Sequence, residues 1–157
     1  MQDYETDARE DDRLELRTWL RLITCCNLME REIRVRLRDS ATVTLPQFDL
    51  LAVLARAPDG LVMGDISRRL MVTNGNVTAL VDRLVREGLL VREVNPRDRR
   101  ALVVRLSEQG WHVFHTVAPA HSEWIDELMR QIPRDKVEAL YDLLADLKLS
   151  VSEARTG

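Results

Sequence analysis

The hydrophobic pattern of this 157-residue chain changes its period at Gly88, and this change limits the fold more than any other feature. Before Gly88, apolar residues recur at helical spacing, namely Val77, Leu80, Val81, Leu84 and Val85. After Gly88 the period becomes two, with one set of alternate residues at Leu90, Arg92 and Val94 and, further along, a second and apolar set at Leu102, Val104 and Leu106. The pattern predicts a helix that leads directly into a β-hairpin. The segment between the two strands is longer than a two-residue turn, so we expect the hairpin tip to project.

Two further short helices are predicted upstream. Residues 46–56 begin with a proline, which the first turn of a helix tolerates, and Thr44 is the expected cap. The breaker run 57–60 ends this helix. Residues 64–70 form a short amphipathic helix, and a tight turn over 71–75 leads to the helix before Gly88. Two short helices, a tight turn and a basic hairpin are the parts of a winged helix-turn-helix. The fold class expected is therefore mainly α (α+β).

Long helices are predicted on both sides of these elements. Residues 13–38 contain neither glycine nor proline and are apolar on more than one side, which indicates contact with a second partner besides the helix's own core. Residues 107–131 follow the hairpin, with Ser107 as the N-cap and with a kink expected at Pro119. A last helix is predicted over 134–152.

Charge is segregated along the chain, although the formal net charge is only −3. Residues 60–106 carry nine arginines against five acidic residues, whereas residues 1–12 carry six acidic residues against one arginine. A basic centre between acidic ends indicates that the centre meets a polyanion. The acidic N-terminus and the lack of a long apolar run favour a cytoplasmic protein. Two adjacent cysteines exclude a disulfide scaffold and a four-cysteine zinc module.

The helix before Gly88 and the hairpin tip carry the candidate DNA-binding residues. An exposed helix fits the major groove of B-DNA, where side chains meet base edges. Arginines at an extended tip are attracted by the negative potential of the minor groove. An acidic residue at the tip would repel phosphate, so its expected role is to hold an arginine in an extended pose. The candidates are Asn74, Asn76, Thr78, Ala79, Arg83, Arg97, Asp98, Arg99 and Arg100.

Residues 45–110 resemble the MarR family of bacterial transcription regulators, through the run VTALVDRLVREGLLVRE followed by DRRALVVRLSEQG. The resemblance implies a homodimer in which each subunit presents one winged helix-turn-helix to half of a pseudopalindromic operator. It also implies that Arg100 enters the minor groove and that Asp98 braces it. Val62 departs from the family pattern, because many relatives have Ser or Thr there. The expected domains are an acidic, flexible tail (1–12), an N-terminal dimerisation helix with its connection (13–45), a DNA-binding lobe (46–106) and C-terminal dimerisation helices (107–157).

Two stretches, MVTNGNVTALVDRL and HSEWIDEL, are similar to a narrower group that represses aromatic-acid and hydroxycinnamate catabolism. This similarity implies a repressor that an aromatic acid or an aryl-CoA thioester releases from its operator. The ligand pocket is expected between the dimerisation helices and the DNA-binding lobe. Clustered arginines near the end of the first helix could hold CoA phosphates. The candidate ligand residues are Trp19, Cys26, Met29, Arg34, Arg36, Arg38, Phe48, Trp111 and His115.

Other functions remain open at this point. Cys25 or Cys26 could make the protein a thiol-based, redox-sensing repressor, which would require a lowered thiol pKa and solvent access. An architectural DNA-binding dimer without an effector is another alternative. His112, His115 and His121 share one helix, but neither a nucleophile motif nor a phosphate-binding loop accompanies them. We therefore expect no enzymatic activity, no cofactor and no metal.

Overall fold

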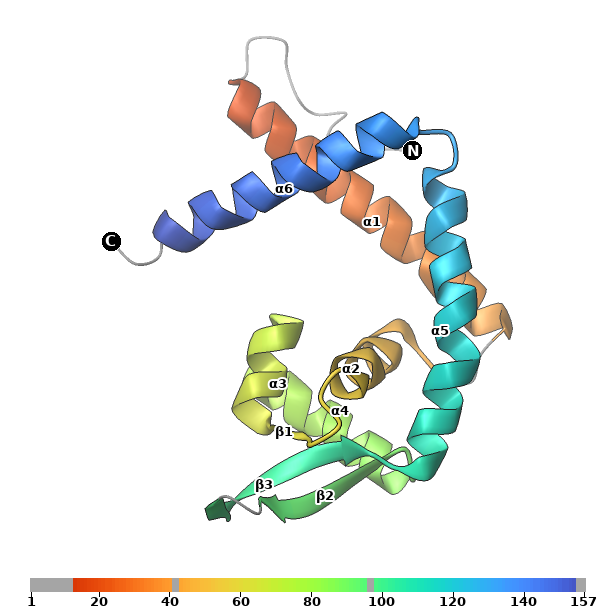
Figure 1. Ribbon diagram of the computed structural model, residues 1–157, viewed down its shortest axis with the longest axis vertical. Coiled ribbons are helices and arrows are strands. Elements are labelled where there is room, and N and C mark those ends of the chain that lie inside the picture. Colours follow the sequence, from red (N-terminus) through yellow and green to blue (C-terminus); the bar gives the residue numbers. More distant parts are fainter. Residues whose placement is uncertain (1–12, 41–42, 96–97, 155–157) are drawn as a thin grey trace. The chain divides into compact units, whose positions relative to one another are not determined.

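A computed structural model describes residues 13–40, 43–95 and 98–154 (Figure 1). The chain divides into two compact units, 1–121 and 122–157, with the boundary inside helix α5. The elements in chain order are α1 (Leu14–Ser40), α2 (Leu45–Ala55), β1 (Leu61–Val62), α3 (Met63–Leu70), α4 (Asn74–Arg86), β2 (Leu90–Asn95), β3 (Asp98–Leu106), α5 (Glu108–Met129) and α6 (Arg134–Ala154).

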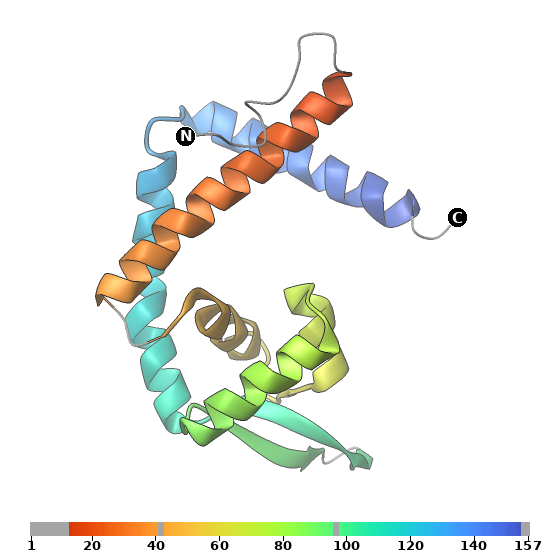
Figure 2. The same ribbon diagram turned by 180° about the vertical axis from the view of Figure 1, so that it is seen from behind.

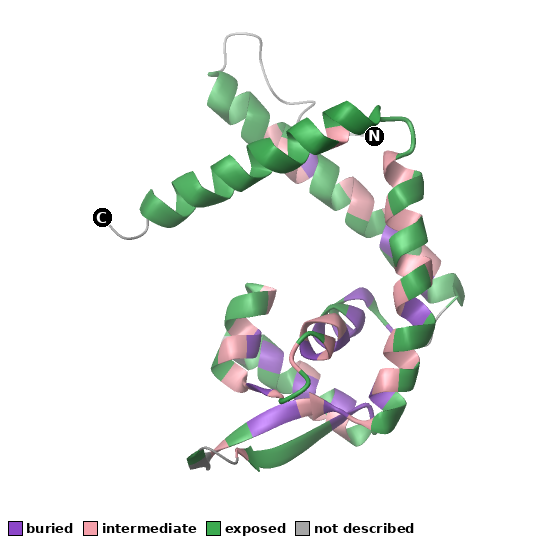
Figure 3. Cartoon of the chain, viewed as in Figure 1, coloured by how far each residue is buried: buried purple, intermediate pink, exposed green. Residues whose placement is uncertain are grey.

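The core of the first unit lies where α2, α3 and α4 pack against a three-stranded antiparallel sheet in the order β1-β3-β2. Leu61 pairs with Val104, and Leu90 pairs with Leu106. The buried residues gather in α2, α4 and the sheet (Figure 3). The side chains that are almost completely buried are Leu37, Leu50, Leu51, Leu54, Ile66, Val77, Val81, Leu84, Leu90 and Val104. The winged helix-turn-helix fold predicted from the hydrophobic period is confirmed.

The hairpin differs from the prediction at its tip. The sequence pattern assigns residues 95–100 to the segment between the strands, but Asn95 pairs with Asp98, so only residues 96 and 97 separate β2 from β3. The pairing shifts between Val94, opposite Leu102, and Asn95. Residues 99–101 of β3 therefore have no counterparts on β2. This β-bulge takes up residues that the sequence pattern assigned to a loop. The two-residue strand β1 was also missed, because two residues are too short to show a period.

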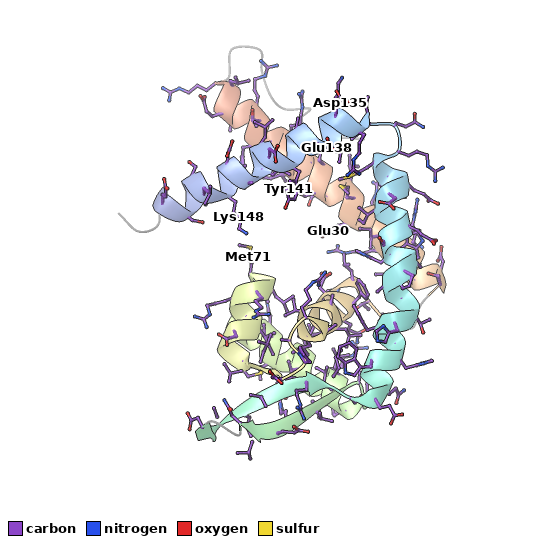
Figure 4. All side chains as sticks on the ribbon, in the orientation of Figure 1. Glu30, Met71, Asp135, Glu138, Tyr141 and Lys148 are labelled. Atoms are coloured by element: carbon purple, nitrogen blue, oxygen red, sulfur yellow. The ribbon has the colours of Figure 1, made fainter. Side chains whose placement is uncertain are left out.

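Local caps explain where the helices begin and end. Thr44 is the N-cap of α2 and shares a capping box with Gln47. The Gly110 N–H donates to Ser107 Oγ at 2.9 Å, which confirms Ser107 as the cap of α5. Gly88 follows α4 with φ +77°, a conformation that favours glycine. Met71 ends α3 in the left-handed region with φ 55°, and its exposed side chain projects from the end of that helix (Figure 4).

The long helices agree with the prediction to within a few residues. α5 remains helical through Pro119, and the predicted kink there stays a prediction. No residue of α6 is buried, although the structure describes the whole of this helix, and Figure 3 shows it exposed along most of its length. Among the described parts of the chain, we find no helix that combines the length and the apolar character needed to cross a bilayer.

Candidate nucleic-acid interface

Helix α4 presents a polar face because its other face is fixed in the core. Val77, Val81 and Leu84 are fully buried. The helical period then leaves four of the predicted DNA-contact residues exposed, namely Asn76, Thr78, Ala79 and Arg83. Figure 2 shows α4 running next to the hairpin of β2 and β3. Asn74 is the first residue of α4, and its side chain lies outside the described part of the structure.

The hairpin of β2 and β3 is the wing of this fold, and the structure describes its tip only in part. Asp98 is exposed at the start of β3, the strand that also contains Arg99 and Arg100. The side chains of both arginines, and the whole of Arg97, lie outside the described residues. The expected bracing of Arg100 by Asp98 therefore stays a prediction.

Two ion pairs hold the wing. Arg92 of β2 donates from Nη2 to Oδ1 of Asp82 on α4, so the side of the hairpin is attached to this helix. Within the hairpin, Arg105 Nη2 lies 2.5 Å from Glu93 Oε2. The first pair links the two elements that were expected to enter neighbouring grooves.

A second set of hydrogen bonds joins the start of α2 to the end of α4. Gln47 is 3% exposed and donates from Nε2 to Glu87 Oε2 at 3.3 Å. Glu87 Oε1 accepts from Arg83 Nε at 2.8 Å. The predicted contact residue Arg83 thus belongs to a chain of contacts that the sequence pattern did not reveal, because Gln47 and Glu87 are 40 residues apart.

An aromatic cluster brings together three of the candidate ligand residues. Phe48 lies 6.1 Å from Phe114 and 4.7 Å from His121, measured between ring centroids. Trp111 stacks on His115 at 5.4 Å and meets the edge of Phe114 at 6.2 Å. Burial lowers the pKa of His121 below its usual range. Phe48 is buried, so it contributes to the core of the lobe as well as to this cluster.

Arg34 lines two clefts in the first unit. The α1–α4 cleft has a volume of about 540 Å³ and carries part of the polar face of α4 in its wall. It is lined by Glu30, Arg34, Leu45, Pro46, Asp49, Leu70, Val72, Asn76, Ala79 and Leu80. The arginine cleft, of about 590 Å³, is lined by Arg31, Arg34, Val35, Leu37, Arg38, Val43, Thr44, Leu45 and Pro46.

The α1–α4 cleft contains an interacting group of charges. Glu30, labelled on α1 in Figure 4, accepts from Arg34 Nη2 at 2.8 Å. Partial burial, and then the negative charge of Glu30, raise the pKa of Asp49, while Arg34 acts in the opposite direction. Measured over the whole residue, Asp49 is nevertheless exposed to solvent. The cleft thus offers one guanidinium and two carboxylates, in a wall that is otherwise largely apolar.

The remaining candidate ligand residues do not join these groups. Trp19 and Cys26 are exposed on α1, and Met29 and Arg36 are partly buried on the same helix. Cys25, the other candidate redox thiol, is exposed as well. The nine candidates therefore do not line one pocket. Sequence reasoning missed Asp49, Leu70 and Val72, because only tertiary packing brings them to the α1–α4 cleft. Among the residues that the structure describes, no group of three His, Cys, Asp or Glu is placed to hold a metal ion.

Comparison with known proteins now identifies the family. The model of the MarR family matches residues 41–101. The crystal structure of a MarR family transcriptional regulator from Silicibacter pomeroyi is 33% identical, with a TM-score of 0.74, over 91% of this chain and 99% of that one. The chain belongs to the MarR family of transcriptional regulators.

Two further comparisons are informative. The transcriptional activatory protein BadR of Rhodopseudomonas palustris is 32% identical over 72% of this chain and 66% of BadR. FabT of Streptococcus pneumoniae, solved in complex with DNA, shares the fold with a TM-score of 0.73 at 21% identity, over 88% of this chain and 98% of FabT. The chain spans slightly less than two thirds of the length of the first curated relatives, from 61 to 66%. The relatives are named as transcriptional regulators rather than enzymes.

Proposed function

We propose that this MarR-family chain binds operator DNA through α4 in the major groove and the β2–β3 wing in the adjacent minor groove. One observation carries the proposal: the exposed polar face of α4 is anchored by a fully buried opposite face and is attached to the wing by the Asp82–Arg92 pair. A helix held in this way presents Asn76, Thr78 and Arg83 without further reorganisation. FabT, which has this fold, binds DNA in its crystal structure.

The proposed functional unit is a homodimer. Large apolar side chains of α6 are exposed, at 39% for Leu140, 40% for Leu144, 43% for Leu147 and 55% for Val151. These four follow helical spacing and form one stripe. Trp19 near the start of α1 is also 56% exposed. An exposed apolar stripe such as that of α6 favours contact with another chain.

The proposed regulation is repression that a small aromatic acid or an aryl-CoA thioester relieves. The α1–α4 cleft supports this because Asn76 and Ala79 belong both to its wall and to the proposed DNA-contact face. A ligand bound there would compete with the DNA for α4 or move this helix. Arg34 is the candidate partner of a ligand carboxylate, and Arg31 and Arg38 of the arginine cleft are candidates for CoA phosphates. The name of BadR favours activation as a second possible outcome of DNA binding.

DNA binding is tested by selecting duplexes from random sequence with the purified protein and measuring affinity at several salt concentrations. We expect Arg100→Ala to bind the selected duplex about tenfold more weakly, with a salt slope lower by about one, because one cationic contact is lost. Arg134→Ala removes the same charge from α6 and serves as the control. Equal affinities for selected and random duplexes would contradict the proposal.

The effector is tested by calorimetry with p-coumaroyl-CoA, feruloyl-CoA and their free acids, followed by DNA binding in their presence. An effector must bind the DNA-free form more tightly than the DNA-bound form to release the operator. If none of these compounds binds, the aromatic effector class is wrong. If instead peroxide weakens DNA binding and Cys25→Ser or Cys26→Ser abolishes that response, the protein is a thiol sensor. If neither treatment changes DNA binding, an architectural role is favoured.

A further inference from the structure

We propose that Gln47, at the start of α2, is a positioning residue for DNA binding that acts through Glu87 on Arg83. This inference rests on the proposed function, because it assigns the way in which one α4 arginine is held for a DNA phosphate. Gln47 does not touch DNA in this proposal. Gln47 orients the carboxylate of Glu87, and this carboxylate in turn orients the guanidinium of Arg83.

The orientation of the Gln47 amide follows from its neighbours. Its Oε1 accepts a hydrogen bond from the backbone N–H of Thr44 at 2.8 Å. A backbone N–H only donates, so it selects the oxygen of the amide. The NH2 group is left to face Glu87 Oε2, an acceptor, at 3.3 Å. With 3% of its surface exposed, Gln47 has little freedom to exchange these partners for water.

Glu87 is well placed to transmit this constraint. It is the C-cap residue of α4, and its backbone N–H donates to the Arg83 carbonyl at 2.9 Å. Its side chain accepts from Gln47 at one carboxylate oxygen and from Arg83 Nε at the other. Both ends of the carboxylate are therefore occupied, so the group has a defined orientation at the end of the helix.

Arg83 remains available to a phosphate in this arrangement. Its side chain is 59% exposed, and the contact with Glu87 engages Nε, so the terminal nitrogens can still donate outward. An arginine that is held before binding loses less rotamer freedom when it meets DNA than an unrestrained one. The buried amide thus contributes to DNA affinity without a DNA contact of its own.

The substitution Gln47→Glu separates this role from the capping of α2. A glutamate retains the acceptor for the Thr44 N–H, as in the usual capping box, but replaces the donor facing Glu87 with a second carboxylate. We expect DNA affinity to fall about three- to fivefold and the salt slope to decrease, because Arg83 is no longer held. Gln109→Glu introduces the same charge at an exposed site near Gly88 and is the matched control.

The decisive experiment combines Gln47→Glu with Glu87→Gln. In this double variant the donor is the amide at position 87 and the acceptor is the carboxylate at position 47, the reverse of the wild type. The net charge equals that of the wild type. We expect this double variant to recover most of the lost affinity for a fluorescein-labelled duplex selected by the wild-type protein. In an Arg83→Ala background, Gln47→Glu should then weaken binding no more than Gln109→Glu does.

The results distinguish this inference from the function on which it rests. If the wild type shows no preference for any duplex, the proposed function fails. If the wild type binds but Gln47→Glu equals Gln109→Glu in affinity and salt slope, the positioning role of Gln47 is wrong. Failure of the double variant to recover affinity, with a thermal midpoint equal to that of the wild type, would also overturn it.

Discussion

Single residues decide how closely the elements of the lobe approach one another. An added Cβ at Gly110 would lie 2.1 Å from the carbonyl oxygen of Leu89, which is backbone and cannot rotate away. The same region contains Ser107, whose Oγ donates to the Gly88 carbonyl at 2.6 Å and accepts from the Gly110 N–H. The end of α4, the start of β2 and the first turn of α5 are therefore locked together around one glycine.

We expect Gly110→Ala to destabilise the protein by about 2–4 kcal/mol, because the first turn of α5 must move away from Leu89. Chemical denaturation followed by circular dichroism measures this loss. Gly64→Ala is the control, since a Cβ at Gly64 in α3 meets nothing within 4 Å. That variant should gain about 0.5–1 kcal/mol from helix propensity. Equal effects of both substitutions would show that the close approach at Gly110 is not restrictive.

Asp49 gives a prediction with a defined pH dependence. Its folded-state pKa lies above the ordinary value of 3.8, because of burial first and of Glu30 second. The folded state therefore keeps this proton to a higher pH than the unfolded state does. The stability that the proton contributes is fully present below about pH 4 and is lost as the pH rises through the folded-state pKa.

Asp49→Asn removes this titration, so we expect the variant to gain thermal stability over the wild type at pH 7 and to lose that advantage near pH 3–4. Thermal unfolding at a series of pH values tests this. Asp146→Asn, at an exposed position of α6, controls for the loss of one negative charge. A constant difference between Asp49→Asn and the wild type across this pH range would rule out the titration of Asp49 as its cause.

At the scale of elements, the hydrophobic period predicts the features of a helix or strand that depend only on residues close in sequence. The buried face of α4 follows from Val77, Val81 and Leu84, since a helix repeats every 3.6 residues. The tip of the hairpin was not predictable in the same way, because the bulge opposite Asn95 depends on the pairing of two strands. The contact between Gln47 and Glu87 and the α1–α4 cleft arise only from tertiary packing, which a period cannot reveal.

The link between α4 and the wing should matter more for DNA binding than for stability. The side chains of Arg92 and Asp82 are 33% and 46% exposed, and partly exposed ion pairs contribute about 0–1 kcal/mol to folding. We expect Arg92→Ala to lower DNA affinity about three- to tenfold. Without the pair, the wing is no longer attached to α4 and is less well positioned for the minor groove when α4 lies in the major groove. Fluorescence anisotropy and thermal unfolding measure the two effects separately.

The control for this prediction is Arg68→Ala. Arg68 pairs with Asp65 in the same short helix, so its removal deletes an arginine without detaching one element from another. A loss of affinity equal to that of Arg92→Ala would indicate that only the charge matters.

At the scale of the whole molecule, the chain consists of a first unit with its own core and a second unit, residues 122–157, whose helix α6 buries none of its residues. Isolated helices gain little from propensity alone, so most helical stability in proteins comes from packing of an apolar face. The exposed leucines of α6 therefore support the proposed homodimer, in which a second chain would cover this helix. Figure 4 shows Tyr141 on this helix, and its side chain is 76% exposed.

We expect the combination of Leu144→Glu and Leu147→Glu to convert the proposed dimer into monomers, because two buried carboxylates would face the apolar stripe of the partner. Sedimentation equilibrium measures the change in mass. Asp142→Lys reverses a charge on the side of α6 opposite the stripe, so it should leave the dimer intact. Operator affinity should fall by about a hundredfold or more in the monomer, since the gain from binding two half-sites at once is lost. A monomeric variant that binds the full operator as tightly as the wild type would show that one lobe suffices, and a wild type that sediments as a monomer would contradict the dimer itself.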